Sequence, residues 1–262
     1  MKRQLKKENR KFNSGIYFLL IITSMFLSVI SCSNDTLDSE IEIIEQPDPK
    51  DDKPIVKACA NGKVYHESNG LVRVDIDQVS SSSSDWKASQ SMTGFEGSGY
   101  IIWTGADNFN LPGQGVVTFS VKINTTGTYQ FVWRSRIGQG TKKSEHNDSW
   151  LRIKGNDFFG QRSSDGHKVY PKGSGKTPNP EGSSKDGWLK VYMNRVGEWF
   201  WKSNTSDNDP HDVFVTFDNP GVYDVEISGR SNAHAIDQFV LFKTDKTLSQ
   251  AQNSSFSETS CK

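Results

Sequence analysis

The sequence predicts an all-β fold, a β-sandwich of the jelly-roll type, over residues 59–243. Three observations lead to this prediction. Short segments of alternating apolar and polar residues recur along the chain. Turn-forming residues such as Gly, Asn and Pro separate these segments. No segment keeps a helical period for long enough to predict a helix.

About ten segments carry the alternation expected of strands, namely 71–77, 99–103, 116–123, 128–136, 149–153, 188–193, 198–202, 213–217, 223–228 and 235–242. In the segment 128–136, Trp133 points to the same face of the strand as Tyr129 and Phe131, which predicts that it lies in the core. Residues 163–187, rich in Gly, Ser, Lys and Pro, predict a long loop. Residues 244–262 are predicted as a polar C-terminal tail.

Composition excludes two broad classes of protein. The chain has 31 basic and 31 acidic residues, so its formal net charge is zero, which argues against a basic nucleic-acid binder. Only 34% of its residues are hydrophobic, which argues against a protein that spans the membrane several times.

The first 31 residues have the pattern of a lipoprotein signal peptide. A basic stretch at 2–11 precedes an apolar run at 16–30 that is short for a transmembrane helix. The run ends in Val29-Ile30-Ser31-Cys32, which resembles the lipobox of a bacterial lipoprotein. The resemblance implies cleavage before Cys32 and acylation of its thiol, and several acyl chains anchor better than one. The alternative is a secretory signal in which the cysteine occurs by chance.

Residues 32–58 are predicted as the lipidated cysteine and a disordered acidic linker. Residues 33–58 hold eight acidic and three basic residues together with three prolines. An acidic stretch directly after the lipidated cysteine resembles the surface-export signal of some bacterial lipoproteins. We therefore expect a lipid-anchored outer-membrane protein, exposed on the cell surface of a Gram-negative bacterium. A solvated spacer is the alternative.

The chain has three cysteines, at 32, 59 and 261. If Cys32 is lipidated, one pair is left in a protein that is exported to an oxidising compartment. We predict a disulfide between Cys59 and Cys261. The alternative is two free thiols in frayed chain ends.

Eight motifs between residues 65 and 243 resemble a known family. They are NGLVRVDID at 69–77, Trp86, GYIIW at 99–103, GTYQFVWRSR at 127–136, HNDSW at 146–150, GWLKVY at 187–192, and GVY at 221–223 followed by GRSNAHAID at 229–237. Their order is similar to that in carbohydrate-binding modules of the galactose-binding-like jelly-roll superfamily, near families 6 and 35. Such modules accompany polysaccharide-degrading enzymes.

A sugar-binding site needs exposed aromatic rings for stacking and planar polar groups for hydroxyls. The stacking candidates are Trp188, Trp199 and Trp201, and the alternative for each is packing in the core. The polar candidates are Arg136, His146, Asn147, Asp148, Asn232 and His234. The resemblance places Asn232 where family 6 modules contact sugar. For residues 146–148 the alternative is a buried network, for example between Arg230 and Asp148.

The resemblance also implies a structural Ca²⁺ ion. Where these modules carry Glu-Ala-Glu, this chain has Asp75-Ile76-Asp77, and Asp237 lies in the last strand. Carboxylate oxygens suit Ca²⁺, so Asp75, Asp77 and Asp237 are the candidate ligands. The alternative is that these acids pair with arginines or cap loops.

Together these features predict a surface lipoprotein that binds a polysaccharide and supports its capture for degradation or uptake. Its expected partners are a polysaccharide or oligosaccharide, the membrane, and glycan-degrading enzymes or transporters. We do not expect catalysis, since we find neither a lyase signature nor a nucleophile elbow in the sequence. A small jelly-roll polysaccharide lyase or glycoside hydrolase is the alternative. A structural lipoprotein that binds a protein partner is the third hypothesis.

Overall fold

The computed structural model describes residue 59 and residues 62–76 and 85–262. The predicted signal peptide, Cys32, the acidic linker and Asp77 lie outside the described residues. Among the residues that the structure describes, no helix has the length and apolar character needed to cross a lipid bilayer.

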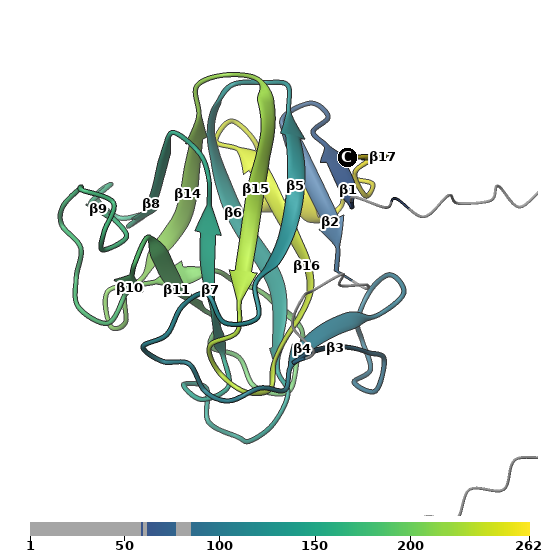
Figure 1. The fold of residues 1–262 in the computed structure, drawn as a ribbon, viewed down its shortest axis with the longest axis vertical. Coiled ribbons are helices and arrows are strands. Elements are labelled where there is room, and N and C mark those ends of the chain that lie inside the picture. Colours follow the sequence, from purple (N-terminus) through teal and green to yellow (C-terminus); the bar gives the residue numbers. More distant parts are fainter. Residues whose placement is uncertain (1–58, 60–61, 77–84) are drawn as a thin grey trace, which may run out of the picture. The chain divides into compact units, whose positions relative to one another are not determined.

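Two β-layers face each other (Figure 1). The first layer contains β17 (Thr259–Cys261), β1 (Lys63–His66), β5 (Val117–Ile123), β15 (Gly221–Ser228), β7 (Asp148–Ile153), β11 (Trp188–Tyr192) and β10 (Ser184–Lys185). Among the described strands only β1 and β5 pair in parallel, and all other pairs are antiparallel.

The second layer contains β2 (Leu71–Asp75), β16 (His234–Lys243), β6 (Gly127–Ile137), β14 (His211–Phe217), β8 (Asp157–Gln161) and β9 (Lys168–Val169). Three short strands extend its edges, β3 (Trp86–Ser89), β4 (Tyr100–Trp103) and β12 (Phe200–Trp201). The short β13 (Asn204–Thr205) pairs with both β11 and β14 and so joins the layers. The predicted all-β sandwich of the jelly-roll type is confirmed.

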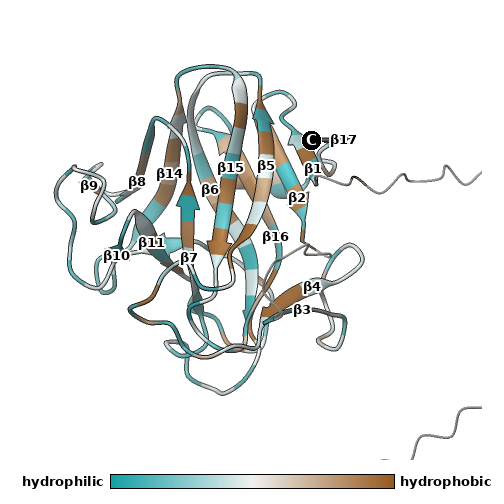
Figure 2. Cartoon of the chain, in the orientation of Figure 1, coloured by the Kyte–Doolittle hydropathy of each residue, from teal (hydrophilic) through white to brown (hydrophobic). Residues whose placement is uncertain are grey.

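The core lies between the layers because the strands alternate as the sequence predicted. Figure 2 shows this alternation as brown and teal bands along the strands. On β14 every second residue is buried, and Trp133 on β6 is fully buried as expected. β16 departs from the rule, because its first nine residues are buried on both faces. Other segments of the chain must therefore cover the face of β16 that points away from the first layer.

The C-terminal segment supplies part of that cover, so the prediction of a polar tail is wrong. Residues 244–262 contain α1 (Leu248–Gln252), which begins at a capping box between Thr247 and Gln250. Ala251 of α1 packs against Val240 and other apolar side chains of the sheet. β17 then pairs with β1. The polar composition misled the prediction because α1 is short and buries only one residue.

The long loop predicted at 163–187 is also more ordered than its composition indicated. It contains β9 and β10, and its Lys172 and Gly187 are joined by a backbone hydrogen bond of 2.8 Å. The strand predicted at 198–202 is reduced to β12.

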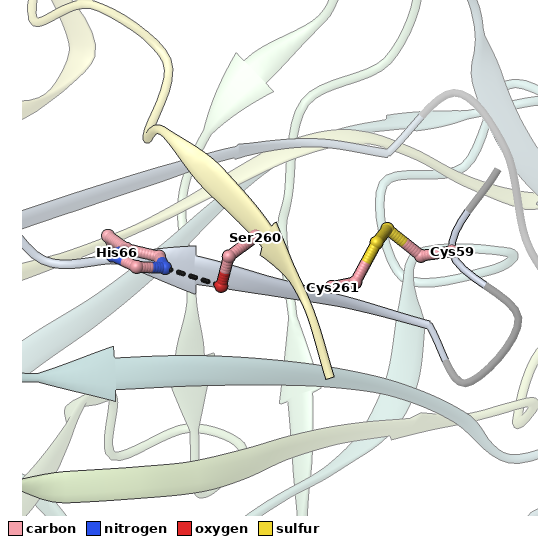
Figure 3. The surroundings of a disulfide bond; sticks show 4 residues. All are labelled: Cys59, His66, Ser260 and Cys261. Carbon is pink, nitrogen blue, oxygen red and sulfur yellow. Dashed lines mark hydrogen bonds between the residues drawn. A yellow bond between two sulfur atoms is a disulfide. The ribbon is translucent and has the colours of Figure 1, made fainter. Parts of the chain in front are cut away.

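The predicted disulfide is confirmed. Cys59 and Cys261 are bonded, across a sequence separation of 202 residues. Figure 3 shows the bond next to a hydrogen bond of 2.8 Å between His66 Nε2 and Ser260 Oγ, which ties β1 to β17. The bridge thus closes nearly the whole domain on itself.

Replacing both cysteines, in the variant Cys59→Ser with Cys261→Ser, should lower the free energy of unfolding by about 2–5 kcal/mol, because the unfolded chain regains the freedom that the closed loop removes. Differential scanning calorimetry measures the effect, and Cys32→Ser is the control that removes a thiol without touching the bridge. If a thiol reagent labelled both Cys59 and Cys261 completely in the native exported protein, the disulfide would be absent and the prediction would be contradicted.

Candidate functional site

Three loops meet at the end of the sandwich where β15 ends and β7 and β16 begin (Figure 1). They are residues 104–116, 138–147 and 229–233. Between them lies a pocket of about 270 Å³, small for a ligand site, which is lined by Asp107, Phe109, Ser144, Glu145, His146, Asp148, Arg230 and Ser231.

The indole of Trp103 shapes two of these loops. It is buried at the end of β4, and a Cβ atom at either Gly105 or Gly229 would overlap its ring. The backbone N–H of Ala233 donates to the Trp103 carbonyl at 2.7 Å, with Ala233 in the left-handed region at φ 62°. The 229–233 loop is therefore packed tightly against the β4 end, which restricts its movement.

A buried ion pair lines part of the pocket. The Arg230 guanidinium donates to Asp148, whose other carboxylate oxygen accepts a hydrogen bond from the Ser231 hydroxyl. The Arg230 and Asp148 side chains are 12% and 8% exposed. This is the buried network considered as the alternative for Asp148, and it also contributes to the pocket wall.

One aromatic ring stands at the pocket with half of its surface in solvent. Phe109 is 49% exposed, and the Arg230 guanidinium lies 4.9 Å from its ring centroid. The same guanidinium lies 5.1 Å from the ring of the buried Trp150. A cation–π contact of this kind contributes about 0.5–1 kcal/mol at an exposed site and so favours this position of the ring. Phe109 thus presents a solvent-facing apolar surface at the pocket.

Sequence reasoning missed Phe109, because only Trp and Tyr were considered for stacking. A signal was present. Phe109 lies in the polar stretch Asp107-Asn108-Phe109-Asn110, outside any strand pattern, where a core position is not expected.

Asn232 connects all three loops. Its side-chain amide donates to the Gly105 carbonyl at 2.8 Å, and its backbone N–H donates to Asp107 Oδ1 at 2.8 Å. Its side-chain oxygen accepts a hydrogen bond from Gln139 at 3.3 Å. The predicted residue therefore does not line the pocket, but its hydrogen bonds hold the lining residues Asp107 and His146 in place.

His146 lies in the pocket wall, at φ 56°. Its Nδ1 lies 2.6 Å from the Asn232 carbonyl oxygen, so Nδ1 carries the hydrogen and donates. The neighbouring Asn147 is buried and donates its side-chain amide to the Met193 carbonyl at 2.6 Å. Of the predicted residues, His146 and Asp148 thus line the pocket, and Asn147 supports it from behind.

The three tryptophans predicted to stack on sugar do not line this pocket. The prediction that Trp188 and Trp199 are accessible is wrong, because they are only 3% and 9% exposed. Trp188 lies under the Arg152 guanidinium at 4.3 Å, and Trp199 packs against Tyr100 at a centroid distance of 5.0 Å. Trp201 is partly buried in the cluster beneath α1.

Arg136 and His234 also lie away from the pocket. Arg136 donates to the Thr93 carbonyl at 3.0 Å. His234 is fully buried between the layers, so the prediction that it contacts a ligand is wrong. Its ring packs against Trp133 at a centroid distance of 5.3 Å, and its Nδ1 lies 2.8 Å from Ser149 Oγ.

Two of the three predicted metal ligands, Asp237 and Asp75, lie next to residues 96–97. Asp237 is fully buried, and one of its oxygens accepts hydrogen bonds from Arg134 and from the backbone of Glu96. Its Oδ1 finds no hydrogen-bond partner among residues 62–76 and 85–262. Burial raises the pKa of Asp237 to about 6. Asp75 lies against Gly97, where an added Cβ would overlap its carboxylate.

No protein-family model and no curated protein matches the chain. Solved structures of carbohydrate-binding modules do. One is the Podospora anserina GH26-CBM35 β-(1,4)-mannanase, at 13% identity and a TM-score of 0.40, over 69% of this chain. The chain spans only 29% of that mannanase.

Two further solved structures are separate modules. The CBM35 module from Cellvibrio japonicus Abf62 is 17% identical, with a TM-score of 0.38, over 65% of this chain and 91% of the module. The module CsCBM6-3 from Clostridium stercorarium, in complex with cellobiose, is 13% identical, with a TM-score of 0.34, over 69% and 98%.

The burial of His234 predicts a pH-dependent stability. Desolvation lowers its pKa from 6.5 to about 4, although the nearby Asp148 carboxylate acts in the opposite direction. Between these values the unfolded state takes up a proton that the folded state does not. The contribution of His234 to the free energy of unfolding should therefore fall, by on the order of 3 kcal/mol, as the pH drops from 6.5 to 4, whereas Asp237, whose pKa is raised to about 6, acts in the opposite direction over this range.

Melting temperatures recorded between pH 4 and 7 test this. In His234→Gln the decline over this range should be clearly shallower than in the wild type, whereas His66→Gln, on the surface strand β1, should leave it unchanged. Equal declines in the wild type and His234→Gln would contradict the assignment.

Proposed function

We propose that the chain binds a polysaccharide through the pocket between its three end loops. The observation that carries this proposal is the half-exposed ring of Phe109 beside a fixed set of charged and polar groups. Sugars present C–H faces that pack on aromatic rings and hydroxyls that need hydrogen-bond partners. The carboxylates of Asp107 and Glu145 and the imidazole of His146 supply such partners around the ring.

The rigidity of the site favours binding. The hydrogen bonds of Asn232 and the ion pair of Arg230 with Asp148 hold the loops before any ligand arrives. A site that is already ordered loses less conformational entropy when it binds. Recognition of one or two sugar units by so small a pocket gives modest affinity, which clustering of the protein on a membrane would increase.

The rest of the proposal concerns where the protein acts. We propose that Cys32 is lipidated, that the protein lies on the outer surface of the outer membrane, and that it holds glycan close to degrading enzymes or transporters. The sequence pattern at 16–32 and the acidic residues that follow support this part of the proposal.

Phe109→Ala should weaken glycan binding about three- to tenfold, because a ligand can bury only the exposed half of the ring and full burial of such a side chain contributes about 1.5–3 kcal/mol. Affinity electrophoresis on a panel of plant, marine and host polysaccharides identifies a ligand and measures the loss. Phe256→Ala is the matched control, since Phe256 is 42% exposed and does not line the pocket.

Equal retention of the two variants would place the binding site elsewhere. Release of new reducing ends or unsaturated products from the same polysaccharides would instead favour the lyase or hydrolase alternative. Absence of retention on every polysaccharide would favour a structural role with a protein partner.

Cys32→Ala should leave the precursor unprocessed and abolish incorporation of labelled fatty acid, since the thiol that receives the acyl group is gone. Metabolic labelling in a bacterial host with the lipoprotein pathway measures this, and Cys59→Ala, which keeps the lipobox, is the control. Normal labelling of Cys32→Ala would overturn the proposed anchor.

We also propose a structural Ca²⁺ held by Asp75, Asp77 and Asp237. The donor set fits a hard cation, because a buried carboxylate oxygen of Asp237 has no partner among the described residues. Arg134 pairs with the other oxygen and offsets part of the charge.

Chelation with EGTA should therefore lower the melting temperature of the full chain, and added Ca²⁺ should restore it, because a ligand that binds only the folded state stabilises it. Asp237→Asn should abolish the response. A melting temperature that neither treatment changes, with no calcium found by elemental analysis, would rule this part of the proposal out.

A further inference from the structure

Three metal-ligating side chains come together in a part of the molecule that the proposed pocket does not use. His167 follows the end of β8, and Asp209 and His211 lie at the turn between β13 and β14. One ligand atom from each lies within 4.8 Å of the other two. None of the three lines the loop pocket.

His211 is held rigidly in this group. It is fully buried at the start of β14, and Gly160 of the neighbouring strand leaves room for it, since an added Cβ there would lie 3.0 Å from the His211 Cβ. Its Nδ1 lies 2.6 Å from the Asp209 carbonyl oxygen and therefore donates to it. This hydrogen bond fixes the tautomer, so Nε2 presents its lone pair to the cluster.

His167 faces this lone pair. A tight turn brings it into place, because its backbone N–H donates to Asp165 at 3.0 Å and its carbonyl accepts from Arg162 at 2.9 Å. His167 Nδ1 lies 3.1 Å from His211 Nε2. Without metal this is an imidazole–imidazole hydrogen bond, and moving the proton to His167 Nε2 leaves both facing nitrogens free to bind a cation.

The third group is the Asp209 carboxylate. Arg162 donates to its Oδ1 at 2.6 Å and also pairs with Asp165. A carboxylate that binds a metal is commonly held by such an outer hydrogen bond. Asp165 and Asp209 carry two negative charges against the one positive charge of Arg162. The cluster therefore keeps a net negative charge when both imidazoles are neutral.

We propose that His167, Asp209 and His211 bind a divalent transition metal, with Zn²⁺ as the preferred ion. Two imidazole nitrogens and one carboxylate suit Zn²⁺, whereas Ca²⁺ takes six to eight oxygen ligands. With Zn–N bonds of about 2.0–2.1 Å, a tetrahedral site places two nitrogens about 3.3 Å apart. The observed 3.1 Å between the facing nitrogens is close to this separation.

The bound ion would tie the turn after β8 to the β13–β14 turn and would keep one coordination position open. Water or a ligand group can take that position. Because the site shares no residue with the loop pocket, it stands or falls independently of glycan binding.

Isothermal titration of the metal-stripped full chain with ZnCl₂ at pH 7.5 tests the proposal. We expect one equivalent of Zn²⁺ to bind. His167→Ala and Asp209→Asn should each weaken this binding at least tenfold. His167 is exposed, so its replacement leaves the buried core unchanged.

His66→Ala is the matched control, because it removes a histidine from β1 and should leave Zn²⁺ binding unchanged. The melting temperature gives a second readout, since bound Zn²⁺ should raise it in the wild type and in His66→Ala only. Absence of Zn²⁺ binding by the wild type would overturn the proposal. Unchanged affinity in both His167→Ala and Asp209→Asn would do so as well, as would displacement of Zn²⁺ by equimolar Ca²⁺.

Discussion

The position of the Trp103 indole determines the shape of the candidate site. The ring is buried at the end of β4, packs against Trp86 at a centroid distance of 5.3 Å, and donates its N–H to the Ala106 carbonyl at 2.9 Å. It therefore belongs to the core on one side and to the loops on the other. Any side chain at Gly105 or Gly229 would have to displace it. The backbone of both loops is thus set by core packing, which tolerates little change in volume.

Buried polar groups link that core to the pocket. Asp148 accepts hydrogen bonds from Arg230 and Ser231 on the loop side, and its charge also acts on the fully buried His234. Loss of one partner from such a network leaves another group desolvated and unpaired, which is costly. Loop positions and core packing are therefore coupled, so that changes in the sandwich interior alter the pocket as well.

The fold was predictable from the sequence because period-2 alternation dominates the long strands, as on β14. The disulfide was predictable from the number of cysteines together with the oxidising compartment that the N-terminal sequence predicts. The C-terminal segment was mispredicted because α1 and β17 are short and their stability depends on contacts with the sheet.

The site was predictable only in part. His146, Asp148 and Asn232 were found through the loops that carry them, and the structure brings these loops together. Trp188 and Trp199 were misassigned because residue type says nothing about which segments cover a sheet from outside, and Thr93 on one such segment accepts a hydrogen bond from Trp199. Phe109 and the cluster of His167 with His211 arise from contacts between distant segments, which no local pattern records.

The disulfide has a mechanical consequence. Force applied to the chain on the N-terminal side of Cys59 enters the folded part at Cys59. From there it passes through the disulfide to Cys261 and also along the chain into β1. β1 is anchored on both sides, by β17 and by the parallel strand β5. Since residues 59–261 form a covalently closed ring, tension between Cys59 and any point inside this ring is shared by two chain paths. Even a partly unfolded domain would then extend less under force than an open chain of the same length.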